Sequence, residues 1–185
     1  MTRIILASKS PRRRELMELL KVPFEVIVSD IDEQIDYNND LVKEIEKLSC
    51  QKANAVYVQH SDALVIGSDT IVKIGNDVLG KPKDLDDARR MLRELSDKTH
   101  EVVTGVTILY QGKAETFSSV AKVTFYPLSD EEIEDYISTN EPMDKAGSYA
   151  IQGDAAKFIR SIEGDYYTIV GLPVAELYHR LKKYL

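Results

Sequence analysis

The sequence of 185 residues is poor in cysteine and histidine and has no long apolar run. Its one cysteine, Cys50, excludes an intramolecular disulfide and a cysteine-based zinc cage, and its three histidines are too scattered to suggest a ligand set. Apolar runs span no more than about half a dozen residues, whereas a membrane-spanning helix needs roughly 20. The start, MTRIILASKSPRRR, lacks the apolar core of a signal peptide. We expect a cytoplasmic protein without a membrane partner, with Cys50 as a helical core residue.

Positive charge is also scarce, and nothing resembles a linker. The net charge of -7 and the isoelectric point near 5.1 argue against nucleic acid as a partner, because the long-range field repels phosphate backbones. Phosphate binding must then come from a local basic site. No repeat, low-complexity tract or Pro/Gly/Ser-rich stretch marks a boundary, and an apolar fraction of 43% is enough for a sizeable core. We expect one domain spanning residues 1–185.

Short apolar runs alternate with helical patterns along the first third of the chain. Strands are predicted near residues 3–7, 24–28 and 63–67, and helices near residues 11–20 and 40–58. This βαβαβ order predicts an α/β fold.

The rest of the sequence adds antiparallel strands. TIVKI and DVLGK flank the turn pair Gly75-Asn76, and TGVTILY and SSVAKVTFY are joined through the turn at residues 111–113, so the sheet is predicted to be mixed. Asp84 is the predicted N-cap of a helix whose apolar face includes Leu85. The helices expected in this part lie near residues 84–96, 129–138 and 173–184.

The segment 10–14, SPRRR, predicts a helix start with an anion-binding character. Ser10 is a natural N-cap, and Pro11 suits the first helical position because its missing N–H costs nothing there. Three arginines in a first turn oppose the helix dipole, so an anion is expected to relieve them. Backbone N–H groups and guanidinium groups that meet at one helix start favour a triphosphate. The alternative, that the arginines pair with Glu15, Glu18 or distant acids, stays open.

Asp69 directly follows the apolar run at residues 63–67, where α/β sheets tend to place ligands. If the turn at residues 75–76 closes a two-residue hairpin, the register extended back along both strands pairs Thr70 with Lys81. Asp69, Thr70 and Lys81 would then be neighbours. An ordinary structural ion pair between the acid and the lysine is the alternative.

Lys52 falls on or beside the apolar stripe of the helix predicted at residues 40–58. A lysine that points inward needs an anion, although a lysine at the edge of the stripe can also extend to solvent. Glu33, in the acidic segment at residues 30–33, is ambiguous on its pattern, since charge-rich loops usually face solvent.

Eight motifs occur in a recognisable order: SKSPRRRELM, the Asp-x-Glu of DIDEQ, QKANAV, GSDT, LGKP, THEVVTGV, EPMDKAGSYAIQG and EGDYYTIVGLPV. From Ile4 to about Tyr178 the sequence resembles the Maf family of nucleotide pyrophosphatases. The resemblance implies a single-domain α/β fold with an elongated mixed sheet and a deep cleft, akin to the inosine triphosphatase fold. It also implies a homodimer, a divalent metal and an association with the arrest of septum formation. The segments SPRR, GSDT and YAIQG resemble the branch that acts on dTTP and UTP.

The same resemblance assigns roles to individual residues. Asp69 matches the catalytic acid that accepts a proton, and we expect it to hold Mg²⁺ or Mn²⁺ together with Glu33. Arg12, Thr70 and Gln152 match positions associated with substrate choice. The substrate-binding residues expected on this basis are Ser8, Ser10, Arg12, Arg13, Lys52, Thr70, Lys81 and Gln152.

Two further segments receive no catalytic role. Residues 143–147, MDKAG, match the family but are equally well explained by a turn that shapes the cleft. Tyr166 and Tyr167 could stack on a base, but we favour the interpretation that they fill the two faces of a strand.

Overall fold

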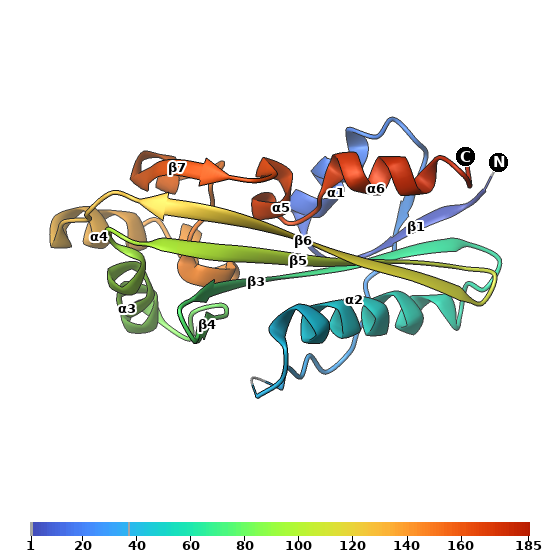
Figure 1. The fold of residues 1–185 in the computed structure, drawn as a ribbon, viewed down its shortest axis with the longest axis horizontal. Helices are drawn as coiled ribbons and strands as arrows, with labels where there is room; N and C mark the ends of the chain where they lie inside the picture. Colours follow the sequence, from blue (N-terminus) through green and yellow to red (C-terminus); the bar gives the residue numbers. More distant parts are fainter. Residues whose placement is uncertain (1, 37) are drawn as a thin grey trace. The chain divides into compact units, whose positions relative to one another are not determined.

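The computed structural model describes residues 2–36 and 38–185. The described chain clusters into two compact units: Met1–Thr70, Thr104–Ser119 and Gly171–Leu185 form the first, and Ile71–Val103 and Val120–Val170 form the second. The sheet order is β2-β1-β3-β5-β6-β7, with β4 paired to β3 (Figure 1). The elements are β1 Ile4–Ala7, α1 Pro11–Glu18, β2 Glu25–Val26, α2 Leu41–Tyr57, β3 Leu64–Ile74, β4 Asp77–Leu79, α3 Leu85–Leu95, β5 Thr99–Tyr110, β6 Lys113–Phe125, α4 Asp130–Ile137, η1 Glu141–Asp144, η2 Ala146–Ser148, η3 Asp154–Phe158, β7 Ile159–Glu163, α5 Tyr166–Val170 and α6 Val174–Leu181.

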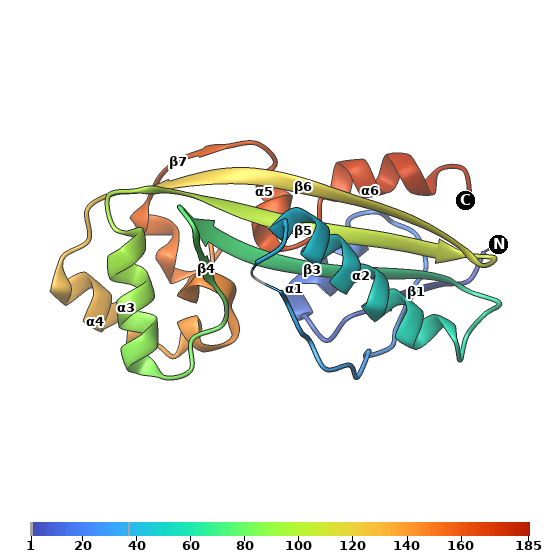
Figure 2. The same cartoon turned by 60° about the horizontal axis from the view of Figure 1, so that its bottom comes forward.

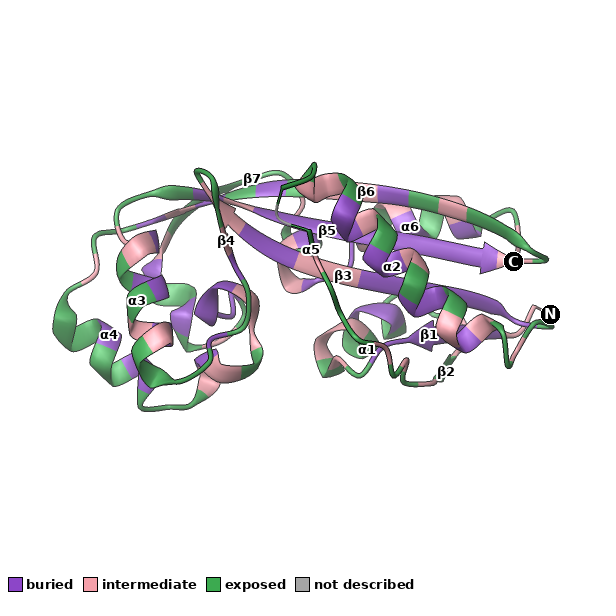
Figure 3. Ribbon diagram, turned by 90° about the horizontal axis from the view of Figure 1, so that it is seen from below, coloured by how far each residue is buried: buried purple, intermediate pink, exposed green. Residues whose placement is uncertain are grey.

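The first unit opens with parallel strands. β1 pairs with β2 on one side and with β3 on the other, in a register that runs from Ile4 opposite Leu64 to Ala7 opposite Gly67. These residues are apolar or small and almost fully buried, as Figure 3 shows for β1 and the first half of β3. The predicted βαβαβ opening is confirmed, and with the antiparallel pairs β3–β4 and β6–β7 so is the mixed sheet.

Helix α2 lies against one face of the first unit's strands and α6 against the other, as Figure 1 and Figure 2 show. Two glycines set the distance of α2 from the sheet. A Cβ at Gly67 would lie 2.2 Å from the carbonyl oxygen of Ser49, and one at Gly105 would lie 2.8 Å from that of Ile45. The helix backbone therefore rests directly on β3 and β5, which brings the side chains of α2 close to the end of the parallel pairing.

The second unit is built around the hairpin of β3 and β4 and the helices α3 and α4. The hairpin has the predicted register, with Ile74 opposite Asp77 across the turn. The side chain of Asp84 accepts a hydrogen bond from the N–H of Asp87 and caps α3 as predicted. The prediction that Leu85 belongs to the buried face is wrong, because this residue is 43% exposed at the first turn.

Several elements differ from the sequence-based expectation. The apolar run at residues 63–67 and the segment TIVKI form one strand, β3, and not two. Tyr166 and Tyr167 begin the short helix α5, so the strand interpretation of these tyrosines is wrong. Cys50 lies in α2 as expected but is partly exposed. Within the described residues, no helix combines the length and the apolar character needed to cross a membrane.

Candidate active site

The end of the parallel pairing between β1 and β3 carries a group of polar residues. Ala7 and Gly67 form the last pair, and Ser8 and Ser68 follow, both buried. Asp69 comes next, with its side chain 13% exposed. Asp69 therefore lies where β1 stops pairing, although β3 itself continues to Ile74. The open edge left by the end of β1 is where α/β sheets place ligands.

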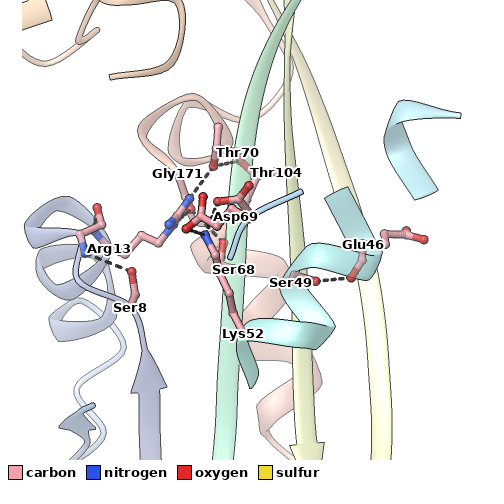
Figure 4. Close-up of polar contacts among 12 residues, drawn as sticks. Ser8, Arg13, Glu46, Ser49, Lys52, Ser68, Asp69, Thr70, Thr104 and Gly171 are labelled. Atoms are coloured by element: carbon pink, nitrogen blue, oxygen red, sulfur yellow. Dashed lines mark hydrogen bonds and ion pairs between the residues drawn. The ribbon is translucent and has the colours of Figure 1, made fainter. Parts of the chain in front are cut away.

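Lys52 joins two carboxylates from other parts of the chain. Its Nζ atom lies 2.6 Å from Oδ1 of Asp69 and 2.9 Å from Oε1 of Glu33 (Figure 4 shows the bond to Asp69). The Lys52 side chain is only 9% exposed. The prediction that this lysine points inward to an anion is confirmed, and a buried ammonium held by two acids is costly to disrupt because each charge would lose its partner.

Arg13 is held by the backbone and by a hydroxyl of the same unit. Its Nε donates to the carbonyl oxygen of Gly171 at 2.8 Å, and its Nη2 donates to Oγ1 of Thr70 at 2.9 Å (Figure 4). Thr70 Oγ1 in turn lies 2.8 Å from Oγ1 of Thr104, which is fully buried on β5. Burial lowers the pKa of Arg13, and the nearby charge of Asp69 opposes that shift.

Gly171, between α5 and α6, contacts both Arg13 and Ser68. Its carbonyl oxygen accepts from both Arg13 and the Ser68 hydroxyl, the latter at 3.2 Å. Its φ of 128° lies in a region that L side chains rarely adopt, so the position favours glycine. The guanidinium of Arg13 is thereby fixed at the same strand end as Asp69.

The serines form a tight turn at the start of α1. The Ser10 N–H donates to Oγ of Ser8 at 3.1 Å, and Oγ of Ser10 accepts from the N–H of Arg13 at 3.4 Å, which confirms the predicted N-cap. Arg14 pairs with Glu18 at 3.4 Å on the exposed side of the helix, as the alternative interpretation of these arginines expected. Arg12 is partly buried. Arg13 is thus directed to the end of the β1–β3 pairing, whereas Arg14 is directed to the helix surface.

The second unit contains the other two expected substrate-binding residues. The β3–β4 ladder ends at the pair Val72–Leu79, so it does not extend to the predicted pairing of Thr70 with Lys81. Beyond β4, the carbonyl oxygen of Gly80 accepts instead from the N–H of Gly147. Lys81 and Gln152 are both exposed.

The two acids that share Lys52 fit a hard divalent cation. Mg²⁺ typically uses one or two carboxylates together with phosphate oxygens of a substrate, so a pair of acids is a sufficient protein contribution. Asp69 and Glu33 each place an oxygen within 2.9 Å of the same Nζ atom. No group of three or more His, Cys, Asp or Glu residues suited to a metal occurs in residues 2–36 and 38–185, so phosphate oxygens would have to complete the coordination.

Sequence reasoning did not single out Ser68, Thr104 or Gly171 as functional. Thr104 and Gly171 lie within the motifs THEVVTGV and EGDYYTIVGLPV, but their partners are distant in sequence. The local signal for Gly171 is its residue type, because glycine adopts a positive φ at no steric cost.

An acid–lysine cluster at the edge of parallel strands, beside an arginine held at a helix start, is typical of α/β proteins that bind phosphorylated ligands. The family model described as Maf-like protein matches residues 3–184, and the chain belongs to this family. A protein of Bacillus cytotoxicus named dTTP/UTP pyrophosphatase is 50% identical over 184 residues, covering 100% of this chain and 96% of that protein. A protein of the same name from Bacillus velezensis is 47% identical, covering 98% and 96%.

Two solved structures are similar at low identity. The Ham1 protein of Staphylococcus aureus matches with a TM-score of 0.47 and 14% identity, over 67% of this chain and 72% of that one. A nucleoside-triphosphatase, described as a dITP/XTP pyrophosphatase, of Mycobacterium abscessus matches with a TM-score of 0.44 and 15% identity, over 75% and 95%.

Proposed function

We propose that this chain hydrolyses dTTP and UTP to the nucleoside monophosphate and pyrophosphate and thereby removes unwanted nucleotides from the cellular pool. The observation that carries the proposal is the contact of the buried Lys52 ammonium with Asp69 and with the more exposed Glu33, beside the fixed guanidinium of Arg13. Relatives that are about half identical over their full length and carry the name dTTP/UTP pyrophosphatase support the substrate. We also propose that both units act as one enzymatic domain, because the family model spans both. The homodimer and the cytoplasmic location remain predictions.

In the mechanism we propose, water attacks the α-phosphorus and the bond to the β-phosphate oxygen breaks, so that pyrophosphate leaves. Asp69 accepts the proton of the attacking water, and Lys52 holds the Asp69 carboxylate in one orientation at 2.6 Å. Glu33 and Asp69 are the residues that would hold Mg²⁺ or Mn²⁺, whose charge supplies stabilisation of the phosphate oxygens when bound.

The cations and hydroxyls around this acid bind the triphosphate in our proposal. The guanidinium of Arg13 faces the strand end in a fixed orientation, as a group must that stabilises charge developing in a transition state. The turn of Ser8 and Ser10 offers backbone N–H groups at the start of α1. Arg12, Thr70, Lys81 and Gln152 are assigned to the substrate by motif, with Gln152 reading the pyrimidine through its amide.

A panel of nucleoside triphosphates tests the proposal. Purified protein is incubated with Mg²⁺ and each nucleotide, and the release of pyrophosphate and of orthophosphate is measured. We expect pyrophosphate from dTTP and UTP. Orthophosphate would move the attack to the γ-phosphate, and binding without turnover would indicate a nucleotide sensor, so either result contradicts the proposal.

The variant Asp69→Asn tests the proposed base. We expect turnover to fall by on the order of a hundredfold or more, the scale of losing an acid–base group, while the protein stays folded. Asp77→Asn, which changes an exposed acid at the β3–β4 turn, is the matched control. Near-normal turnover in folded Asp69→Asn protein would remove Asp69 from the role.

A further inference from the structure

Gln152 is the exposed residue of a segment that is otherwise well anchored in the second unit. Its neighbours Ala150 and Ile151 are 6% and 9% exposed. The N–H of Gly153 donates to the carbonyl oxygen of Ala150 at 3.1 Å and closes a turn around Gln152. The backbone on both sides of this turn is held by buried residues, so the direction of the Cα–Cβ bond of Gln152 depends on those anchors.

Glu141, the first residue of η1, is the anchor on the C-terminal side of the turn. Its Oε1 accepts from the N–H of Asp154 at 3.2 Å. A Cβ at Gly153 would lie only 2.0 Å from the same oxygen, so the carboxylate occupies the space that a side chain at position 153 would take. The φ of Gly153 is -104°, which any residue adopts, so this glycine is required by the carboxylate and not by its own backbone conformation.

Glu141 itself is fixed from several directions. Its N–H donates to Oγ1 of Thr139 at 3.2 Å, and its carbonyl oxygen accepts from Nζ of Lys145 at 2.7 Å. Burial raises the pKa of the Tyr136 phenol and the charge of Glu141 raises it further, whereas Oε2 of Glu141 is buried without a hydrogen-bond partner among the described residues. The Tyr136 hydroxyl accepts from the N–H of Ala150 at 3.3 Å. Glu141 therefore holds the C-terminal end of the turn through the Asp154 N–H, while Tyr136 holds the other end through the Ala150 N–H.

We infer that Glu141 is a positioning residue for substrate choice, which holds the turn at residues 150–153 so that the Gln152 amide is presented in one orientation. The inference rests on the proposed role of Gln152 in reading the base. A fixed amide discriminates between bases because a mismatched base leaves its donor or acceptor unpaired, whereas a mobile amide adapts. The motif EPMDKAGSYAIQG is then one functional unit, in which its first residue, Glu141, positions Gln152.

The test compares the ratio of kcat/KM for dTTP to that for dGTP in a set of variants, with a thermal melt of each. Glu141→Ala removes the acceptor for the Asp154 N–H, and we expect the ratio to fall by about tenfold, the scale of one lost hydrogen bond. Glu141→Gln keeps an oxygen acceptor and is expected to retain the preference. Asp154→Ala removes an exposed side chain but keeps the N–H that Glu141 binds, and it serves as the matched control.

Gly153→Ala disturbs the contact of Glu141 with the turn by a change in the turn itself. It tests the inference even if Glu141→Ala does not fold. Its Cβ displaces the carboxylate, and we expect the same loss of preference. In the double variant of Glu141→Ala with Gln152→Ala, the ratio should be no lower than in Gln152→Ala alone, because Glu141 acts through Gln152. An unchanged ratio in Glu141→Ala and Gly153→Ala, with a lowered ratio in Gln152→Ala, overturns the positioning role alone. An unchanged ratio in Gln152→Ala overturns the base-reading role of Gln152 as well.

Discussion

Mild acid is expected to destabilise this protein through His100, a buried histidine on β5. The ring is 1% exposed and packs edge-on against Phe125 and Tyr149. Nε2 lies 2.7 Å from the Tyr149 hydroxyl, and Nδ1 has no hydrogen-bond partner among the described residues. A proton added to this ring would be buried without a counter-charge, and burial accordingly lowers the pKa of His100 from 6.5 to about 4.

The sign and size of the effect follow from proton binding. Below pH 6.5 the unfolded chain takes up a proton on His100 that the folded chain does not take up until about pH 4. The stabilising effect of the neutral ring is therefore fully present above pH 6.5 and is lost as the pH falls toward 4. The difference between the two pKa values corresponds to about 3 kcal/mol in total, of which about 2 kcal/mol is lost by pH 5.

Urea denaturation at about pH 7.5 and about pH 5 measures this loss. Other groups titrate in the same range, so the loss is compared with that of His100→Gln, whose amide does not titrate and still offers a partner to the Tyr149 hydroxyl. We expect the free energy of unfolding of the parent protein to fall by about 2 kcal/mol more than that of the variant between the two pH values. Equal losses would show that His100 does not titrate in this way and would refute the reasoning.

Three further predictions concern the first unit. Lys52→Met leaves Asp69 and Glu33 without their shared cation, and turnover of dTTP should fall by on the order of a hundredfold. Lys47 is an exposed lysine on the same helix, and Lys47→Met should leave turnover unchanged. Thr104→Val removes a hydrogen-bond partner of the Thr70 hydroxyl that supports Arg13, and the KM for dTTP should rise by about tenfold. Thr104→Ser keeps a hydroxyl and should keep the KM of the parent protein. Equal KM values in the two variants would contradict the support role. Gly67→Ala forces α2 away from β3 and should lower the free energy of unfolding by roughly 1 to 3 kcal/mol in urea, while Gly80→Ala, where an added Cβ meets nothing within 4 Å, should change it little.

The sequence was most informative where the determining interactions are local. The Ser10 N-cap, the Asp84 N-cap and the turn at residues 75–76 all depend on contacts within a few residues, and each was predicted correctly. The interpretation of Tyr166 and Tyr167 was wrong because the β-branched and aromatic run was weighed without Asp165. The Asp165 carboxylate accepts from both the N–H and the hydroxyl of Thr168 and favours a helical turn over an extended strand.

The prediction for strand β3 was wrong for a different reason: the polar residues at its centre were interpreted as the end of a strand. Ser68, Asp69 and Thr70 interrupt the apolar pattern, which favoured two strands. The strand continues because each of these side chains has a partner elsewhere in the chain: Gly171 for Ser68, Lys52 for Asp69, and Arg13 for Thr70. The sequence predicted that Lys52 points inward, because helical periodicity fixes a face. It gave no partner for Glu33, because the segment before α2 has no periodic pattern.

The arrangement around Arg13 also bears on how the site discriminates between ligands. The resemblance associates Thr70 with substrate choice, and the structure has the Thr70 hydroxyl accepting from Arg13 and bonded to Thr104. The bonds to Gly171 and Thr70 use only part of the donor set of the guanidinium, so its orientation is fixed while it can still donate to an anionic oxygen. A change at position 70 would then alter the binding of all triphosphates by moving Arg13, and not the choice between their bases. Thr70→Ser, which keeps the hydroxyl, should preserve triphosphate binding, whereas Thr70→Val should weaken the binding of every triphosphate in the panel to a similar degree.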